Sequence, residues 1–120
     1  MVGLVGDSDQ VEGCEVENIL CVVTRDDAPN YRFMGRLVAE ATSKTDSSQS
    51  KWETYRLWHT WKGSRVCQAM KFGEGVDGSF SSTTAELMSN DDYVIEFFGW
   101  GTLAKQLYAL VGISTYTDIE

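Results

Sequence analysis

One short glycine pattern in this sequence has the spacing of a dinucleotide-binding loop: GEGVDG at residues 73–78, within KFGEGVDGSF. Such a loop follows a strand and opens a helix, whose N-terminal N–H groups hold the phosphates. The residues after Gly78 are SFSSTT, which do not begin a helix, and Glu74 and Asp77 would repel a phosphate group. The pattern therefore predicts an acidic loop over residues 72–79 and no bound cofactor.

His59 is the only histidine, and histidine is the side chain that ordinarily titrates near neutral pH. A nucleophilic pair with Cys67 would need both side chains on one face of a sheet. In the hairpin expected for this region, Cys67 lies on the face opposite His59, because successive side chains alternate. We therefore expect His59 to be a hydrogen-bonded structural residue opposite Gln68.

The remaining polar groups do not have the spacing of a catalytic or metal site. Two pairs of adjacent acids, Asp26-Asp27 and Asp91-Asp92, are explained by a turn and by the start of a helix. The three cysteines are scattered without C-x-x-C spacing, the single histidine adds no metal-ligand spacing, and there is no D-x-D-x-D-G calcium loop. The sequence thus favours a protein that is not an enzyme and binds no metal.

The charge distribution restricts the possible partners. The 120 residues are enough for one domain and carry a net charge of −8. Residues 1–17 contribute −5, residues 18–71 contribute +4 and residues 72–120 contribute −7. Nucleic-acid binding is disfavoured, because phosphate contacts need clustered lysines and arginines. No apolar run approaches the length of a membrane span and the first residues lack a signal-peptide pattern, so we expect a cytoplasmic protein with no membrane partner.

Two strands are expected in the first half of the chain. Residues 1–17 are expected to form a flexible acidic arm ahead of a single domain over residues 18–120. The apolar run NILCVVT at residues 18–24 is typical of a strand buried on both faces. Residues 31–42 alternate between apolar and polar side chains, which predicts a half-buried strand with a bulge at Gly35.

Residues 51–72 predict a β-hairpin. If Gly63 and Ser64 form a two-residue type II′ turn, Trp61 lies opposite Val66, and apolar side chains meet apolar ones along that face. A turn shifted by one residue sets apolar side chains against polar ones instead. The sequence therefore favours the turn that begins at Gly63, with a positive φ at this glycine.

The last third of the chain predicts helices. Residues 81–90 suggest one or two helical turns, and residues 90–113 predict a helix, a break and a second helix. Asn90 caps the first helix, the glycines of Gly99-Trp100-Gly101 interrupt it, and Thr102 caps the second. The apolar stripe of the second helix consists of Leu103, Leu107, Leu110 and Val111. The expected fold is α+β, with roughly four antiparallel strands and C-terminal helices packed on one face.

Aromatic side chains concentrate in the hairpin. Trp52, Arg56 and Trp58 fall on one strand face, and Trp61 falls on the other. If helices cover one face, tryptophans line a second surface, which is a pocket, a dimer interface or part of a two-sided core. Aromatic rings among acidic groups favour a cationic ligand. The candidate ligand or interface residues are therefore Trp52, Arg56, Trp58, Trp61 and His59.

Three segments, RLVAEATSK, SKWETYRLWHTWKGSRVC and VIEFFGWGTLAKQLYALVGI, resemble small proteins of plasmids and mobile elements of the integron-cassette type. The pattern shared with them is W-x-E-x-x-L-[YW]-x-T-x-x-G followed by G-x-L-A-K-x-L-Y. Here the acid is displaced to Glu53, and the resemblance covers about residues 35–113. That group has no established activity, so the resemblance implies only an accessory protein of a mobile element.

The function expected from these features is binding without catalysis. The leading hypothesis is an accessory protein that contacts a partner protein, or a second copy of itself, through an aromatic sheet face. The alternative is a pocket for a cationic or aromatic small molecule. We also expect a homodimer whose interface includes Trp58 or Trp52 with Arg56 nearby, because the apolar strands exceed what one short helical layer covers.

Overall fold

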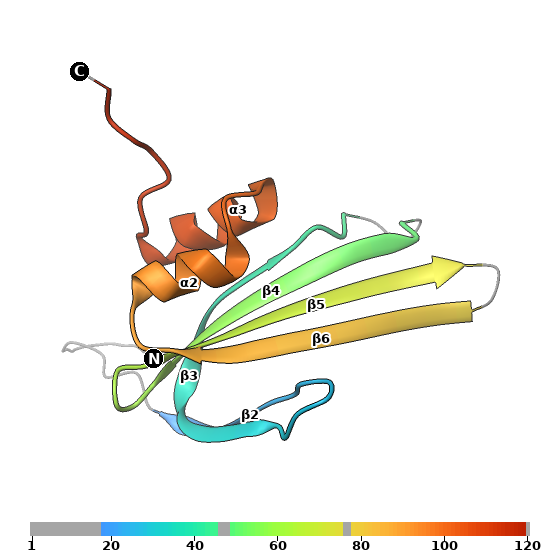
Figure 1. The fold of residues 1–120 in the computed structure, drawn as a ribbon, viewed down its shortest axis with the longest axis horizontal. Coiled ribbons are helices and arrows are strands. Elements are labelled where there is room, and N and C mark those ends of the chain that lie inside the picture. The colour runs from blue at the N-terminus through green and yellow to red at the C-terminus, as the bar shows by residue number, and fades with distance from the viewer. Residues whose placement is uncertain (1–17, 46–48, 76–77, 120) are drawn as a thin grey trace, which may run out of the picture.

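Within the described residues, five strands are followed by two helices (Figure 1). The structure is a computed structural model, and it describes residues 18–45, 49–75 and 78–119. The expected arm at residues 1–17 lies outside this range. The elements are β2 (Ile19–Val23), β3 (Tyr31–Thr42), β4 (Lys51–Thr60), β5 (Arg65–Gly75), β6 (Gly78–Met88), α2 (Asp91–Phe98) and α3 (Thr102–Val111).

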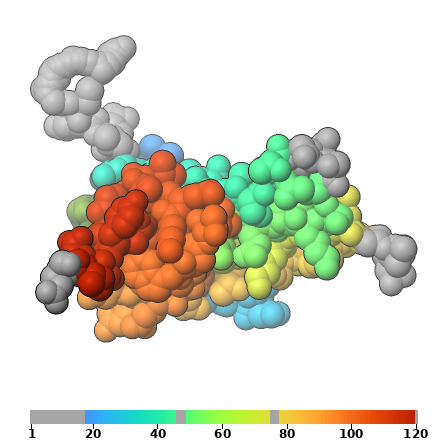
Figure 2. All heavy atoms as spheres, turned by 90° about the horizontal axis from the view of Figure 1, so that it is seen from above, coloured from blue at the N-terminus to red at the C-terminus, as the bar shows by residue number. Residues whose placement is uncertain are grey.

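The strands form one antiparallel sheet in the order β2-β3-β4-β5-β6, so each strand pairs with its neighbour in sequence. Both helices pack on the same face, with α2 against β5 and β6 and α3 against β3 and β4. Seen from above, they cover one end of the sheet and leave the other end open (Figure 2). The predicted α+β class with C-terminal helices on one face is confirmed, and the described sheet has five strands where roughly four were expected.

The sheet is curled because β3 bends. The pairing of β3 with β4 shifts between Leu37 and Ala39, and a bulge bends the strand that carries the extra residue. The first half of β3 and all of β2 therefore turn beneath the rest of the sheet and form a half-barrel (Figure 1). The bulge was expected at Gly35, but this glycine instead permits a close approach of strands. A Cβ at this position would lie 2.3 Å from the carbonyl oxygen of His59.

Apolar side chains on the helix-covered face form the larger core cluster. Leu57 and Cys67 pair across β4 and β5 at its centre, and they are 1% and 0% exposed. Leu107 and Tyr108 close the cluster from α3. Leu107 is buried as the predicted helical stripe requires, whereas Leu110 of the same stripe is exposed and Tyr108 is buried in its stead.

A second cluster lies inside the curl, on the opposite face of the sheet. Trp58 and Val66 pair across β4 and β5, and Cys21 and Val23 of β2 pack against them. All four side chains are buried. The sheet therefore has an apolar core on each face, which is one of the three arrangements that the aromatic hairpin left open.

The prediction that residues 18–24 form a strand buried on both faces is wrong. β2 is an edge strand of the sheet, and only its inward side chains are buried. Ile19, Leu20 and Val22 are 60%, 62% and 58% exposed. A continuous apolar run indicates a strand, but it does not show whether a second layer of the protein covers the outward face.

The β4–β5 hairpin forms, but its predicted register is wrong. Trp58 takes the place opposite Val66 that was expected for Trp61. The turn consists of residues 61–63, and Gly63 at its end has a φ of 90°. The positive φ is therefore confirmed, whereas a three-residue turn replaces the two-residue one. The longer turn moves the pairing so that Trp58 faces the interior of the curl.

β6 replaces two elements that were predicted differently. Residues 72–79 were expected as a loop and residues 81–90 as helical turns, and both predictions are wrong. β5 continues to Gly75 and β6 begins at Gly78, so the glycine pattern lies between antiparallel strands and opens no helix. Its central residues 76–77 lie outside the described ranges. Threonine is common both in strands and at helix caps. Pairing with β5 places Thr83 and Thr84 in a strand.

The helix boundaries agree with the sequence, with one difference. The side chain of Asn90 accepts a hydrogen bond from the N–H of Tyr93 at 3.1 Å, as a capping residue does. The first helix ends at Gly99, whose φ is 78°. The predicted cap at Thr102 is wrong by one position, because Thr102 is already helical and Gly101 is the N-cap.

Replacing Gly63 by alanine should destabilise the protein by about 1–2 kcal/mol, because a side chain at positive φ is strained. No atom lies within 4 Å of the added Cβ, so the loss would report backbone strain alone. Lys62→Ala in the same exposed turn is the matched control and should change little. Urea denaturation measures both variants, and equal midpoints for the two would contradict the turn geometry.

Replacing Tyr108 by phenylalanine should cost about 1–2 kcal/mol of stability, because it removes a buried hydrogen bond. The Tyr108 hydroxyl donates to the carbonyl oxygen of Gly99 at 2.6 Å, which links α3 to the break between the helices. Tyr116→Phe, at a residue that is 84% exposed, is the control. A shift of thermal midpoint for Tyr108→Phe no larger than that of the control would show that the bond contributes nothing.

Candidate binding site

A hollow of about 370 Å³ opens at the end of the half-barrel that holds the β4–β5 turn. The first half of β3 and the turn form its walls, and β5 and β6 contribute one apolar residue each. This volume is within the range of sites for small molecules. The aromatic and aliphatic lining residues are Tyr31, Phe33, Met34, Trp61, Val66 and Leu87.

The backbone holds the turn in place while the indole ring of Trp61 remains accessible. The N–H of Trp61 donates to the carbonyl oxygen of Met34 at 2.9 Å, next to the pairing of Gly35 with Thr60. The N–H of Ser64 donates to the hydroxyl of Thr60 at 3.0 Å. The Trp61 side chain is nevertheless 63% exposed, so a ligand could contact it without rearranging the turn.

The charged side chains around this hollow are cations. Arg32 and Lys62 line it, and no carboxylate is among its described lining residues. Lys62 Nζ lies 5.6 Å from the centroid of the Trp61 ring. Arg25 adds a third cation, since its guanidinium lies 4.3 Å from the ring centroid of Tyr31. The rim therefore attracts negative charge.

The structure separates the residues that the sequence grouped into one candidate site. Trp52, Arg56 and Trp58 share one face of β4, but Trp58 is 8% exposed and belongs to the core inside the curl. Arg56 forms an ion pair with Glu40 on the neighbouring strand. Trp61 lies in the turn, so it alone among the predicted tryptophans lines the hollow.

Trp52 belongs to a separate aromatic pair near the other end of the sheet. Its ring stacks on Phe72 with the ring centroids 5.3 Å apart. Lys44 Nζ lies 3.9 Å from the centroid of the Trp52 ring. The sequence suggested that these aromatics would bind a cation, and a cation of the protein itself already occupies that position at Trp52.

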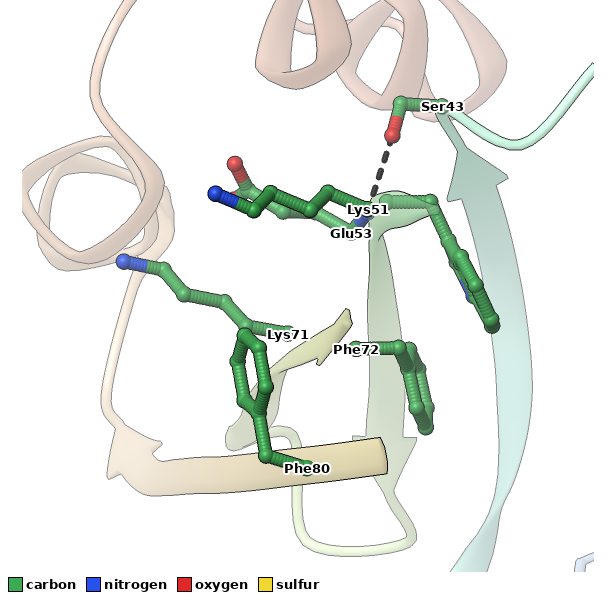
Figure 3. Close-up of a pocket in the computed structure, with 7 residues that line it drawn as sticks. Ser43, Lys51, Glu53, Lys71, Phe72 and Phe80 are labelled. Carbon is green, nitrogen blue, oxygen red and sulfur yellow. Dashed lines mark hydrogen bonds between the residues drawn. The ribbon is translucent and has the colours of Figure 1, made fainter. Parts of the chain in front are cut away.

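A smaller hollow of about 250 Å³ adjoins this pair (Figure 3). Lys51, Glu53 and Lys71 extend to the same side, whereas Phe72 points away from them. The N–H of Glu53 donates to the Ser43 hydroxyl at 2.8 Å, which ties the strand to the loop before it. Charges of both signs line this hollow, so it selects no ligand charge and is the weaker candidate.

His59 and Cys67 lie on the same face of the sheet, contrary to the prediction, because His59 pairs with Arg65 and not with Gln68. Burial raises the pKa of the Cys67 thiol to about 12. The thiol therefore stays protonated at neutral pH and is a poor nucleophile. Burial, followed by the charges of Arg65 and Arg36, lowers the pKa of His59.

Sequence reasoning missed most of the hollow. Tyr31 and Phe33 were placed on a half-buried strand, but nothing in the sequence indicates that the strand bends to meet the turn. Leu87 was predicted to lie in helical turns, so its position on β6, opposite Val66 of β5, was not foreseen. Arg32 and Lys62 belong to the basic middle segment of the chain, and that charge excess was the one signal pointing to the rim.

Neither a metal-binding cluster nor a membrane-spanning helix is present among residues 18–45, 49–75 and 78–119. In these ranges, no group of three or more histidine, cysteine, aspartate or glutamate side chains could hold a metal ion. The helices of these ranges are also too short or too polar to cross a membrane. Of the two hollows, the one beside Trp61 remains the stronger candidate, because its lining is mostly apolar and its charged lining residues share one sign.

No family model matches this chain, and neither a curated protein nor a solved structure is detectably similar to it. The resemblance to proteins of plasmids and mobile elements therefore stays a prediction. The geometry and charge of the hollow are the basis on which a function can be argued.

Lowering the pH from about 7.5 to 5.5 should destabilise the protein more than it destabilises a His59→Asn variant. The pKa of His59 is lowered in the folded state, so the unfolded chain takes up the proton first and stability is lost as the pH falls. Urea denaturation at both pH values measures the difference. Equal losses for the two proteins would contradict the lowered pKa.

Proposed function

We propose that this chain is a non-enzymatic binding protein. Its ligand places an apolar group in the hollow beside Trp61 and a negative charge at the rim. The observation that carries the proposal is an apolar hollow whose charged lining residues, Arg32 and Lys62, are both cations. A cytoplasmic accessory role in a mobile element, as expected from the sequence, is part of the proposal.

The apolar component of the proposed ligand follows from the exposure of the lining. Trp61, Leu87 and Met34 are 63%, 55% and 43% exposed, and all three line the same concavity. Exposed apolar side chains that gather in this way are characteristic of binding sites, whereas isolated ones are ordinary. Val66 is 1% exposed and also lines the hollow, so a bound apolar group would lie directly on the core inside the curl.

The charge of the proposed ligand follows from the rim. A carboxylate, sulfonate or phosphate near Arg32 and Lys62 would gain attraction from both, and Arg25 behind Tyr31 adds to the same field. The sequence had suggested a cationic ligand, because acids dominate the chain as a whole. The local charge at this hollow has the opposite sign and supports an anion.

The lining residues support binding rather than catalysis. Hydroxyl groups are present at Tyr31, Thr60 and Ser64, but the described lining includes no histidine, cysteine or carboxylate to activate one of them. His59 lies on the face of the sheet opposite to the curl, with Leu57 and Cys67. A polar reaction in the hollow would therefore lack a histidine or carboxylate general base among its described lining residues.

Two dyes with a closely related ring system separate the apolar and the ionic parts of the proposal. Anilinonaphthalene sulfonate carries a negative charge, and N-phenylnaphthylamine lacks it. Trp61→Ala should weaken the binding of both dyes about ten-fold, because it removes the main apolar contact. Arg32→Ala combined with Lys62→Ala should weaken only the sulfonate, and the loss should shrink at high salt. Fluorescence titration measures each dissociation constant.

Tyr116→Ala and Lys105→Ala are the matched controls, because both residues are exposed and lie outside the hollow. Neither should change the affinity for either dye. Unchanged affinity of both dyes for Trp61→Ala would overturn the site, and equal loss of both dyes in the double variant would overturn its preference for anions. Circular dichroism confirms that each variant is folded before titration.

A further inference from the structure

The two edges of the sheet are protected differently. At the β6 edge, the N–H of Asp26 donates to the carbonyl oxygen of Thr83 at 2.9 Å. The N–H of Thr83 donates in turn to the carboxylate of Asp26 at 2.8 Å. Both free backbone groups of Thr83 are thereby satisfied, so this edge is blocked near its middle. Natural sheets often block an edge in this way, because an open edge recruits another strand.

The β2 edge has no comparable protection among the described residues. β2 pairs with β3 on one side and is the last strand of the sheet. Its sequence, ILCVV, contains no charge, no proline and no glycine. These are the features that keep a strand edge from pairing with another chain.

The outward face beside this edge is apolar around Leu20, and Arg32 on β3 is the residue that pairs with Val22. Leu20 and Val22 are 62% and 58% exposed, and Met34, which pairs with Leu20 on β3, is 43% exposed. Ile19 at the start of the strand is 60% exposed. An unpaired edge next to an exposed apolar strip supplies both the backbone groups and the side chains that a second strand needs.

We propose that β2 pairs antiparallel with β2 of a second copy of this chain, across a two-fold axis at Cys21. The two curled sheets then become one continuous sheet of ten strands in the dimer, five from each copy. Leu20 of one copy lies opposite Val22 of the other, so four apolar side chains form a closed strip on the outward face. Met34 contributes both to this strip and to the hollow, but the variants that test the two proposals are different.

The position of the axis follows from the residue types. With the axis at Cys21, all five residues of β2 lie opposite residues of β2 in the second copy. An axis at Val22 would set Ile19 against Arg25, and an axis at Leu20 would set Val22 against Asn18.

This interface replaces the one expected from the sequence. Trp58 is buried within its own chain, and Trp52 is covered by Phe72 and Lys44, so neither offers the open apolar surface that a dimer interface needs. β2 was expected to be buried on both faces, and its observed exposure moves the proposed contact to the sheet edge. The partner remains a second copy, since the strand is complementary to itself.

Sedimentation at about 1–100 µM tests the assembly. The unmodified chain should approach twice the 13.4 kDa chain mass as the concentration rises. Leu20→Lys and Val22→Lys should each weaken the dimer at least about ten-fold by placing like charges across the axis. Leu110→Lys is the matched control, because Leu110 is also 62% exposed but lies on α3, and it should leave the dimer intact.

A monomer at every concentration would overturn the proposal. So would a dimer that Leu110→Lys disrupts as strongly as the β2 variants do. Thermal denaturation checks that each lysine variant is folded. Leu20 and Val22 are exposed, so both variants should retain the fold.

Disulfide crosslinking tests the register separately from the assembly. Cys21 of the two copies would face each other at the axis, so the test uses a Cys14→Ser, Cys21→Ala background. In it, a mixture of Leu20→Cys and Val22→Cys chains should form a covalent dimer on mild oxidation. Each variant alone should form much less, because residues 20 and 22 face each other only across the axis at Cys21. Equal crosslinking by either variant alone would show that the axis lies elsewhere. Non-reducing electrophoresis measures the outcome.

Discussion

A bulge between Leu37 and Ala39 lets β3 leave the plane of the sheet, and the other packing arrangements follow from that bend. Without it, β2 would extend the sheet sideways and the indole of Trp58 would face water. With it, the β2–β3 hairpin covers the concave face, and the backbones of β3 and β4 approach so closely at Gly35 that a Cβ would meet the carbonyl oxygen of His59. The half-barrel is therefore a consequence of one extra residue and one missing side chain.

Because of the bend, the β4–β5 hairpin contributes side chains to two apolar cores, one on each face of the sheet. Leu57 and Cys67 face the helices, while the next pair along the strands, Trp58 and Val66, faces the interior of the curl. A slip by one residue would exchange the two faces and put each set into a core shaped for the other, so the register is strongly specified. The three-residue turn that ends at Gly63 is compatible with this register, and a two-residue turn is not.

The same curl explains where apolar surface is left over. A half-barrel does not close, so it keeps the sheet edges that a full barrel lacks, and one end of the curl stays open. The open end becomes the hollow beside Trp61, and Arg32 and Lys62 give its rim a positive charge although the chain is acidic overall. The β6 edge is blocked by Asp26, whereas no residue of the described ranges blocks the β2 edge. The two proposals, a ligand for the hollow and a second copy for β2, concern these two remaining surfaces.

The sequence by itself determined the fold class, the limits of the two helices and the positive φ of Gly63, because such signals act within a few residues. Asn90 caps its own helix wherever that helix packs. Tertiary structure alone decided that β2 is an exposed edge, that residues 78–88 are a strand, and that Trp58 is buried while Trp61 is accessible. These properties depend on strand register and on the bend of β3, which join residues far apart in the chain. No local pattern of residue types encodes such long-range pairings.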